Sequence, residues 1–77
     1  MNKLTKEIAE TLIGKYIATK TENSPEEKVE RGKDYSEQAG YVHSIEKDGE
    51  GHWWLVYDWG WGVRIDAIVD YWEETPI

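Results

Sequence analysis

The sequence predicts an α+β fold, in which an N-terminal amphipathic helix packs on a small, strongly bent antiparallel sheet or barrel of about four to five strands. Three observations predict it: apolar residues every fourth position over 2–13, apolar alternation over 52–65, and a glycine-rich turn directly before that alternation. A chain of 77 residues supports one small core, so we expect a single domain over 1–77.

The first expected element is a helix over residues 2–13, followed by a strand over 15–21. The apolar stripe of the helix is Leu4, Ile8 and Leu12. Asn2 is a suitable N-cap residue, and Gly14 suits the position just past the helix end. Such a short helix is marginal alone, so its apolar stripe should pack on the sheet.

Residues 22–34 predict an exposed loop, with one helical turn after Ser24-Pro25 as an alternative. The segment has mixed charges, a proline and a glycine, and Val29 is its single apolar residue. Loops of this length in small domains are often functional.

Segments 40–47 and 52–65 predict the two arms of a β-hairpin around a turn at 48–51. The odd positions from Trp53 to Ile65 are all apolar or aromatic and should face the core, together with Tyr41 and Ile45 of the first arm. These faces match if Ile45 lies opposite Leu55 and Tyr41 opposite Trp59. That register requires a three-residue loop in which Gly51 has a positive φ.

The second arm is too long to stay straight, and Gly60 and Gly62 interrupt it. We therefore expect it to bend sharply between Asp58 and Gly62. Residues 69–72 should form the terminal strand.

Net charge and aromatic residues both concentrate in the second half of the chain. After residue 34 there are two cations and nine carboxylates, so the whole net charge of −7 lies there, with nine of the ten aromatic residues. This charge repels phosphate backbones, which argues against direct nucleic-acid binding. No apolar run is long enough for a membrane helix, and the chain has no cysteine, which together favour a cytoplasmic location.

The second half resembles small β-barrels of the SH3 type. The resemblance rests on the pair Trp53-Trp54 and on the block from Gly62 to Val69, which corresponds to a family segment containing a 3₁₀ turn. It implies a five-stranded barrel-like sheet. Ile65 and Ile68 stand where that family has its ligand-packing Pro and Tyr, which weakens the implication of a proline-rich ligand. The resemblance would expose Trp53, whereas the alternation of the strand exposes Trp54.

We expect no enzymatic activity, no metal site and no cofactor. His43 and His52 are too far apart in the expected hairpin to share a metal, and the pair Asp48 and Glu50 lacks the ligand spacing of a calcium loop. A hydrolytic carboxylate pair would need a cleft that so short a chain hardly supplies.

The expected function is binding to another protein. Carboxylates steer an encounter with a cationic surface, and Trp and Tyr supply the anchors of an interface. We predict an inhibitor that docks on the basic, nucleic-acid-binding surface of its partner, as small acidic phage or mobile-element anti-defence proteins do. The expected contacts are Glu46, Glu50, Trp54, Asp58, Asp66 and Asp70.

Three alternatives remain open at this point. The first is an SH3-like peptide-recognition module that binds a basic or proline-containing segment. Its groove would be lined by Trp53, Tyr57 and Trp59. The second is an aromatic cage for a cationic small group, or a sugar-stacking face, built from exposed Trp and a carboxylate. The third is a homodimer formed through an exposed aromatic strand edge.

Overall fold

The protein has a small α+β fold with one five-stranded antiparallel sheet, which does not close into a barrel. A computed structural model describes residues 3–76. The strand order is β4-β3-β2-β1-β5, and all neighbours are antiparallel. The strands are β1 (Tyr16–Glu22), β2 (Tyr35–Lys47), β3 (Trp53–Tyr57), β4 (Gly62–Arg64) and β5 (Ile68–Glu73). The helices are α1 (Lys6–Glu10), α2 (Pro25–Arg31) and the 3₁₀ helix η1 (Ile65–Ala67).

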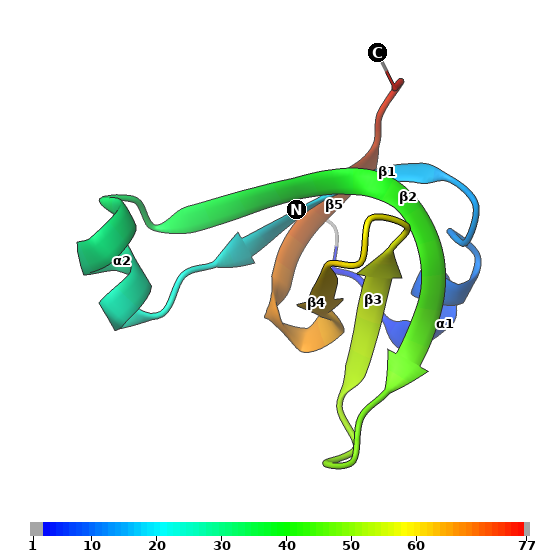
Figure 1. Ribbon diagram of the computed structural model, residues 1–77, viewed down its shortest axis with the longest axis horizontal. Coiled ribbons are helices and arrows are strands. Elements are labelled where there is room, and N and C mark those ends of the chain that lie inside the picture. The colour runs from blue at the N-terminus through cyan, green and yellow to red at the C-terminus, as the bar shows by residue number, and fades with distance from the viewer. Residues whose placement is uncertain (1–2, 77) are drawn as a thin grey trace.

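The long strand β2 arches over the molecule and belongs to both halves of the sheet (Figure 1). Residues 35–41 of β2 pair with β1, and residues 42–47 pair with β3. β1 also pairs with β5, and β3 with β4. The observed terminal strand β5 exceeds the expected 69–72 by one residue at each end.

Helix α1 has five residues and is much shorter than the expected helix over 2–13. Thr5 caps its N-terminus by accepting a hydrogen bond from the Ile8 backbone N–H at 3.2 Å, whereas the expected cap Asn2 lies outside the described residues. The expected apolar stripe of Leu4, Ile8 and Leu12 does not form one buried face of a helix. Leu4 is buried ahead of the helix, while Ile8 is 39% exposed.

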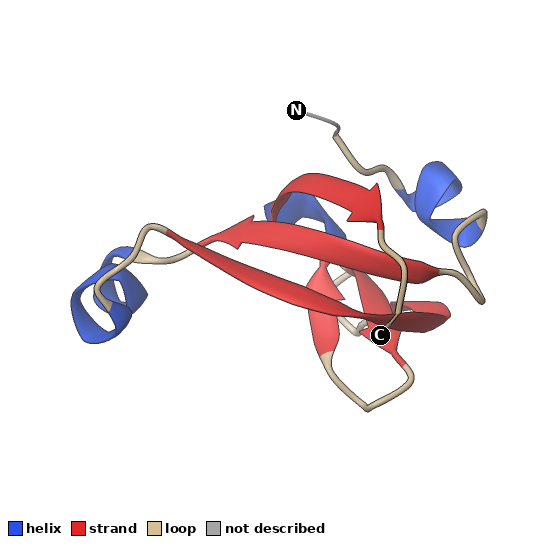
Figure 2. Cartoon of the chain, turned by 90° about the horizontal axis from the view of Figure 1, so that it is seen from above, coloured by secondary structure: helices blue, strands red, loops and turns tan. Residues whose placement is uncertain are grey.

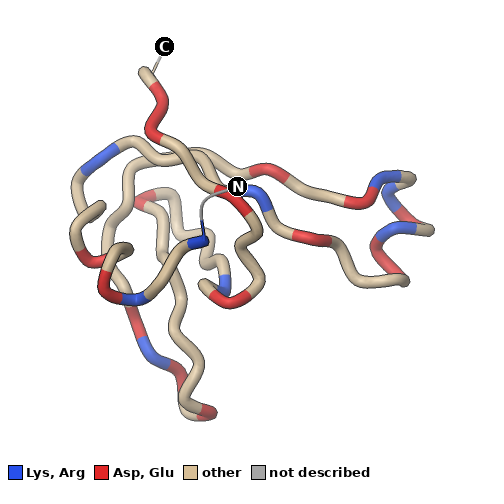
Figure 3. Tube along the Cα trace, turned by 180° about the vertical axis from the view of Figure 1, so that it is seen from behind, with Lys and Arg blue, Asp and Glu red and all other residues tan. Residues whose placement is uncertain are grey.

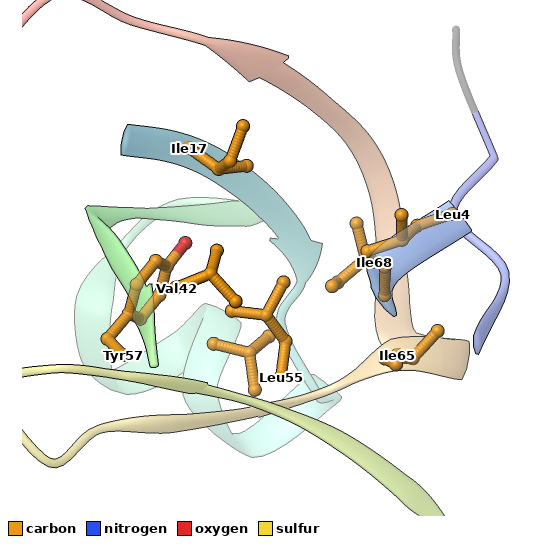
Figure 4. Close-up of a cluster of buried hydrophobic side chains, with 9 residues drawn as sticks. Leu4, Ile17, Val42, Leu55, Tyr57, Ile65 and Ile68 are labelled. Atoms are coloured by element: carbon orange, nitrogen blue, oxygen red, sulfur yellow. The ribbon is translucent and has the colours of Figure 1, made fainter. Parts of the chain in front are cut away.

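The core lies between the bent halves of the sheet (Figure 4). Leu4 enters it from the N-terminal segment and packs with Ile65 and Ile68. The remaining buried residues of the cluster are Ala9, Ile17, Val42, Leu55, Tyr57 and Val63. No helix among residues 3–76 is long and apolar enough to cross a membrane.

The β2–β3 hairpin confirms the expected register near its turn: Ile45 pairs with Leu55, and Gly51 has φ +87°. The register then shifts at His43, so that Val42 pairs with Tyr57. This β-bulge reverses the faces of β2 beyond it. The expectation that Tyr41 faces the core is therefore wrong, and Val42 is buried in its place.

Residues 22–34 are not only a loop, because they contain helix α2. Ser24 and Glu27 form a capping box, with Pro25 in the first turn and Gly32 in a left-handed conformation at the C-terminal end. The helix buries no residue and stands beyond the ends of β1 and β2, apart from the other elements (Figure 2). We call residues 19–38 the arm; at its base, residues 19–21 also pair with β5.

Candidate functional site

The outer face of the β2–β3–β4 half of the sheet carries a row of cross-strand neighbours. Trp54 pairs with Glu46 of β2 on one side and with Arg64 of β4 on the other. Leu55 and Tyr57 point into the core, so the alternating Trp54 and Val56 point outward and are half-buried. The structure thus confirms the outward orientation of Trp54 that the sequence alternation predicts.

The Trp54 ring lies against the neighbouring strand at Gly62. A Cβ atom added at Gly62 would stand 3.4 Å from Cε3 of Trp54, which is an ordinary van der Waals contact. The ring therefore lies directly beside the backbone of β4.

Asp48 fixes both the hairpin turn and the Trp54 ring. Its Oδ1 accepts hydrogen bonds from the backbone N–H groups of Glu50 (2.8 Å) and His52 (2.9 Å). Its Oδ2 accepts a hydrogen bond of 2.7 Å from the Trp54 indole Nε1. These donors stabilise the carboxylate, the indole most of all, and lower the pKa of Asp48 to about 2.

Further charged groups lie on the neighbouring strand and in the hairpin turn. Arg64 makes a two-pronged ion pair with Asp66, with Nη2 to Oδ2 at 2.9 Å, and this pair lowers the pKa of Asp66. The Asp66 hydrogen bond is also the main cause that raises the pKa of Arg64, with smaller contributions from Asp48 and Glu50. The His52 Nδ1 lies 3.7 Å from the Asp48 and Glu50 carboxylates.

We call this surface the Trp54 face. It comprises Glu46, Asp48, Glu50, His52, Trp54, Val56, Gly62, Arg64 and Asp66. Figure 3 shows acidic positions at the tip of the β2–β3 hairpin and interleaved acidic and basic positions on the arm. Lys47 adds one positive charge beside the Trp54 face: it lines a hollow with Trp54, and its ammonium group lies 5.9 Å from the Trp53 ring centroid.

Two tryptophans that should face the core are exposed instead. Trp59 and Trp61 are 52% and 47% exposed, because the chain turns at Asp58–Gly60 and leaves the sheet there. Their rings stack with centroids 5.9 Å apart, and Trp59 stacks on Tyr57 at 5.8 Å. The Trp59 indole Nε1 donates a hydrogen bond of 3.2 Å to the Ala39 carbonyl, so the stack is anchored to β2.

A cavity of about 340 Å³ lies between the arm and β4, beside the Trp54 face. The arm contributes polar side chains to it, and the β3–β4 side contributes two indoles. Its lining includes Thr21, Ser36, Gln38, Trp54, Trp61 and Gly62. The arm wall is held in place by a network in which Arg31 donates to Ser36 Oγ and Ser36 Oγ donates to Asn23 Oδ1.

Four of the six expected contact residues gather on the Trp54 face: Glu46, Glu50, Trp54 and Asp66. Asp58 lies apart from them, at the turn that carries Trp59. Asp70 lies on β5 opposite Lys20, in the other half of the sheet. Whether these residues contact a partner stays a prediction.

The three residues of the expected peptide groove do not share one surface. Tyr57 is only 1% exposed and belongs to the core, so the expectation that it lines an open groove is wrong. Trp53 lies beneath Lys6, whose ammonium is 4.8 Å from the ring centroid, whereas Trp59 lies in the β3–β4 turn. The N-terminal segment thus lies over part of the surface that the SH3 resemblance assigns to a ligand, with a hollow of about 310 Å³ between them.

Sequence reasoning missed Asp48, Gly62 and Trp61 as members of a site. Asp48 had a visible signal, because it precedes two glycines and stands six residues before Trp54. Trp61 also had one, because it lies between Gly60 and Gly62 where a bend was expected, but the apolar alternation placed it on the core face. Within residues 3–76, no group of three or more His, Cys, Asp or Glu side chains is arranged to hold a metal ion.

The chain matches no protein-family model, no curated protein and no solved structure.

Proposed function

We propose that this protein is a non-enzymatic binding domain that docks its Trp54 face on a basic surface of a partner protein. The observation that carries the proposal is an indole held beside carboxylates: Asp48 orients Trp54, Glu46 is the cross-strand neighbour of Trp54, and Glu50 lies in the same hairpin turn as Asp48. A rigid, half-buried indole loses little conformational entropy on binding. Carboxylates at its rim accept charge-assisted hydrogen bonds from Lys and Arg.

The basic surface is proposed to be one that otherwise holds nucleic acid. Such a surface presents clustered Lys and Arg, and a chain of net charge −7 is attracted to it at long range. Occupying it would exclude DNA or RNA, which makes the protein an inhibitor of a nucleic-acid enzyme. The inhibitor role is also supported by analogy with small acidic proteins of phages and mobile elements.

The experiment is affinity capture from cells that carry this protein, with the Trp54→Ala chain as the matched control. The captured partner should bind the unchanged chain in competition with DNA or RNA, and its affinity should fall steeply with salt. A partner that binds both chains equally, with an affinity insensitive to salt, contradicts the proposal.

A second candidate is an SH3-like peptide-recognition module. The strand order, in which five strands follow β4-β3-β2-β1-β5, and the 3₁₀ helix between β4 and β5 support an SH3-like arrangement. Coverage of Trp53 by Lys6 and burial of Leu4 beside Ile65 weigh against a ligand at that family's usual surface. A panel of short Pro- and Arg-containing peptides tests it, because binding there should shift the Trp53 indole signal.

A further inference from the structure

Strand β4 has one free edge. It stands at the end of the strand order and pairs only with β3 in the described chain. The Tyr57 N–H donates to the Trp61 carbonyl at 2.8 Å at the hairpin end. Hydrogen-bonded pairs alternate along an antiparallel ladder, so Leu55 and Val63 form the next such pair. The backbone N–H and C=O groups of Gly62 and Arg64 therefore point away from β3.

The free edge of β4 borders a cavity whose opposite side is formed by the arm. The cavity of about 340 Å³ is lined on one side by Gly62 and Arg64, and on the other by Ser36 and Gln38 of the arm. A second hollow of about 190 Å³ is lined by Glu46, Lys47, Asp48, Trp54, Val56 and Gly62. Trp54 and Gly62 line both, so the two hollows adjoin beside β4.

The opposing arm limits what can occupy this space. A folded second copy would have to approach β4 past the arm, whereas a single extended chain needs only the room beside one strand, about 5 Å between backbones. The charged side chains beside Trp54 indicate the composition of the extended chain that would bind there. Two carboxylates, Glu46 and Asp48, and one cation, Lys47, line the hollow beside Trp54, so its charge is net negative. Arg64 is neutralised by Asp66.

We propose that an extended, basic segment of the partner protein adds as a strand to the free edge of β4. Its backbone pairs with Gly62 and Arg64, and a Lys or Arg side chain lies over Trp54 between Glu46 and Asp48. This inference rests on the proposed function, since it names the part of the partner that meets the Trp54 face. Main-chain pairing supplies affinity, and the carboxylates supply the preference for a basic residue.

The test is an NMR titration of the full chain with an alternating Lys–Val octapeptide, and with an alternating Glu–Val octapeptide as the reversed-charge probe. We expect saturable shifts of the Gly62 and Arg64 amides and of the Trp54 indole with the Lys–Val peptide alone. Amide exchange of Gly62 and Arg64 should slow on saturation, because strand pairing protects their N–H groups. Shifts without such protection, or equal binding of both peptides, overturn the inference.

A proline variant gives an independent check of strand pairing. Gly62→Pro removes the edge N–H and places its Cβ at van der Waals distance from Trp54, and it should weaken Lys–Val binding roughly tenfold, which is the loss of about one main-chain hydrogen bond. Gly49→Pro is the matched control, because Gly49 stands at a turn position that accepts proline and has nothing within 4 Å of an added Cβ. If Gly62→Pro fails to fold, amide exchange of Gly62 and Arg64 in the unchanged chain decides whether the peptide pairs with β4.

The failure of this inference is distinguishable from failure of the proposed function. If the captured partner loses affinity with Trp54→Ala but not with Gly62→Pro, docking on the Trp54 face stands and strand addition is wrong. If neither change matters, both fail. Self-association in the absence of peptide, seen as a doubled mass in sedimentation, would assign the edge to a second copy and overturn the inference.

Discussion

A buried hydrogen-bonded pair joins the two halves of the sheet, and its removal should measurably destabilise the fold. The Tyr57 hydroxyl lies 2.8 Å from Thr19 Oγ1 and 3.2 Å from the Gln38 carbonyl. The carbonyl can only accept, so Tyr57 donates to Gln38 and Thr19 donates to Tyr57. Tyr57 is 1% exposed and Thr19 is fully buried, and burial raises the pKa of the Tyr57 phenol.

Tyr57→Phe removes both contacts and leaves the Thr19 hydroxyl buried without this partner, which should cost about 1–3 kcal/mol. Thr19→Val keeps the shape of the side chain and leaves Tyr57 bonded to Gln38, so it should cost about 1 kcal/mol. The double variant should cost less than the two single costs together, by about 0.5–1.5 kcal/mol, because it leaves no orphaned hydroxyl.

Urea denaturation followed by tryptophan fluorescence and circular dichroism measures these free energies of unfolding. A 77-residue domain has a stability of roughly 4–12 kcal/mol, so losses of this size are well resolved. Strictly additive costs, or a neutral Tyr57→Phe, would refute the pairing of the two hydroxyls.

Three further changes test other parts of the fold. Gly51→Val should destabilise by about 1–2 kcal/mol in the same urea assay, because Gly51 has φ +87°; a tolerated substitution contradicts the turn geometry. The pKa of Asp48 is about 2 in the folded chain and 3.8 ordinarily, so its contribution to stability is full above about pH 4 and is lost as pH falls toward about 2. Acid titration of the urea midpoint should show this loss in the unchanged chain and a smaller one in Asp48→Asn. Gly40→Ala places a Cβ 2.6 Å from the Trp59 indole nitrogen, so it should cost about 1–3 kcal/mol and shift the Trp59 indole NMR signal, and an unchanged signal speaks against the stack.

The sequence predicted those features of the fold that depend on local alternation and turn chemistry. The pairing of Ile45 with Leu55 followed from matching apolar faces, and the positive φ of Gly51 followed from the loop length that this register requires. The outward orientation of Trp54 followed from the same alternation.

Other features depend on long-range packing and had no local signal. Nothing in the residues around His43 marks the bulge that buries Val42 in place of Tyr41. Helix α1 begins later than expected because Leu4 packs in the core before the N-cap Thr5, which periodicity alone does not reveal. The capping box Ser24–Glu27, in contrast, was readable and favours α2.

The central claim is that the protein meets its partner through the Trp54 face. The most direct measurement is amide and indole shift mapping of the chain bound to the captured partner. We predict that the perturbed signals cluster at Glu46, Trp54 and Arg64, while those of Trp72 on β5 stay unchanged. A perturbed surface centred on Trp72, with Trp54 unaffected, would contradict the claim.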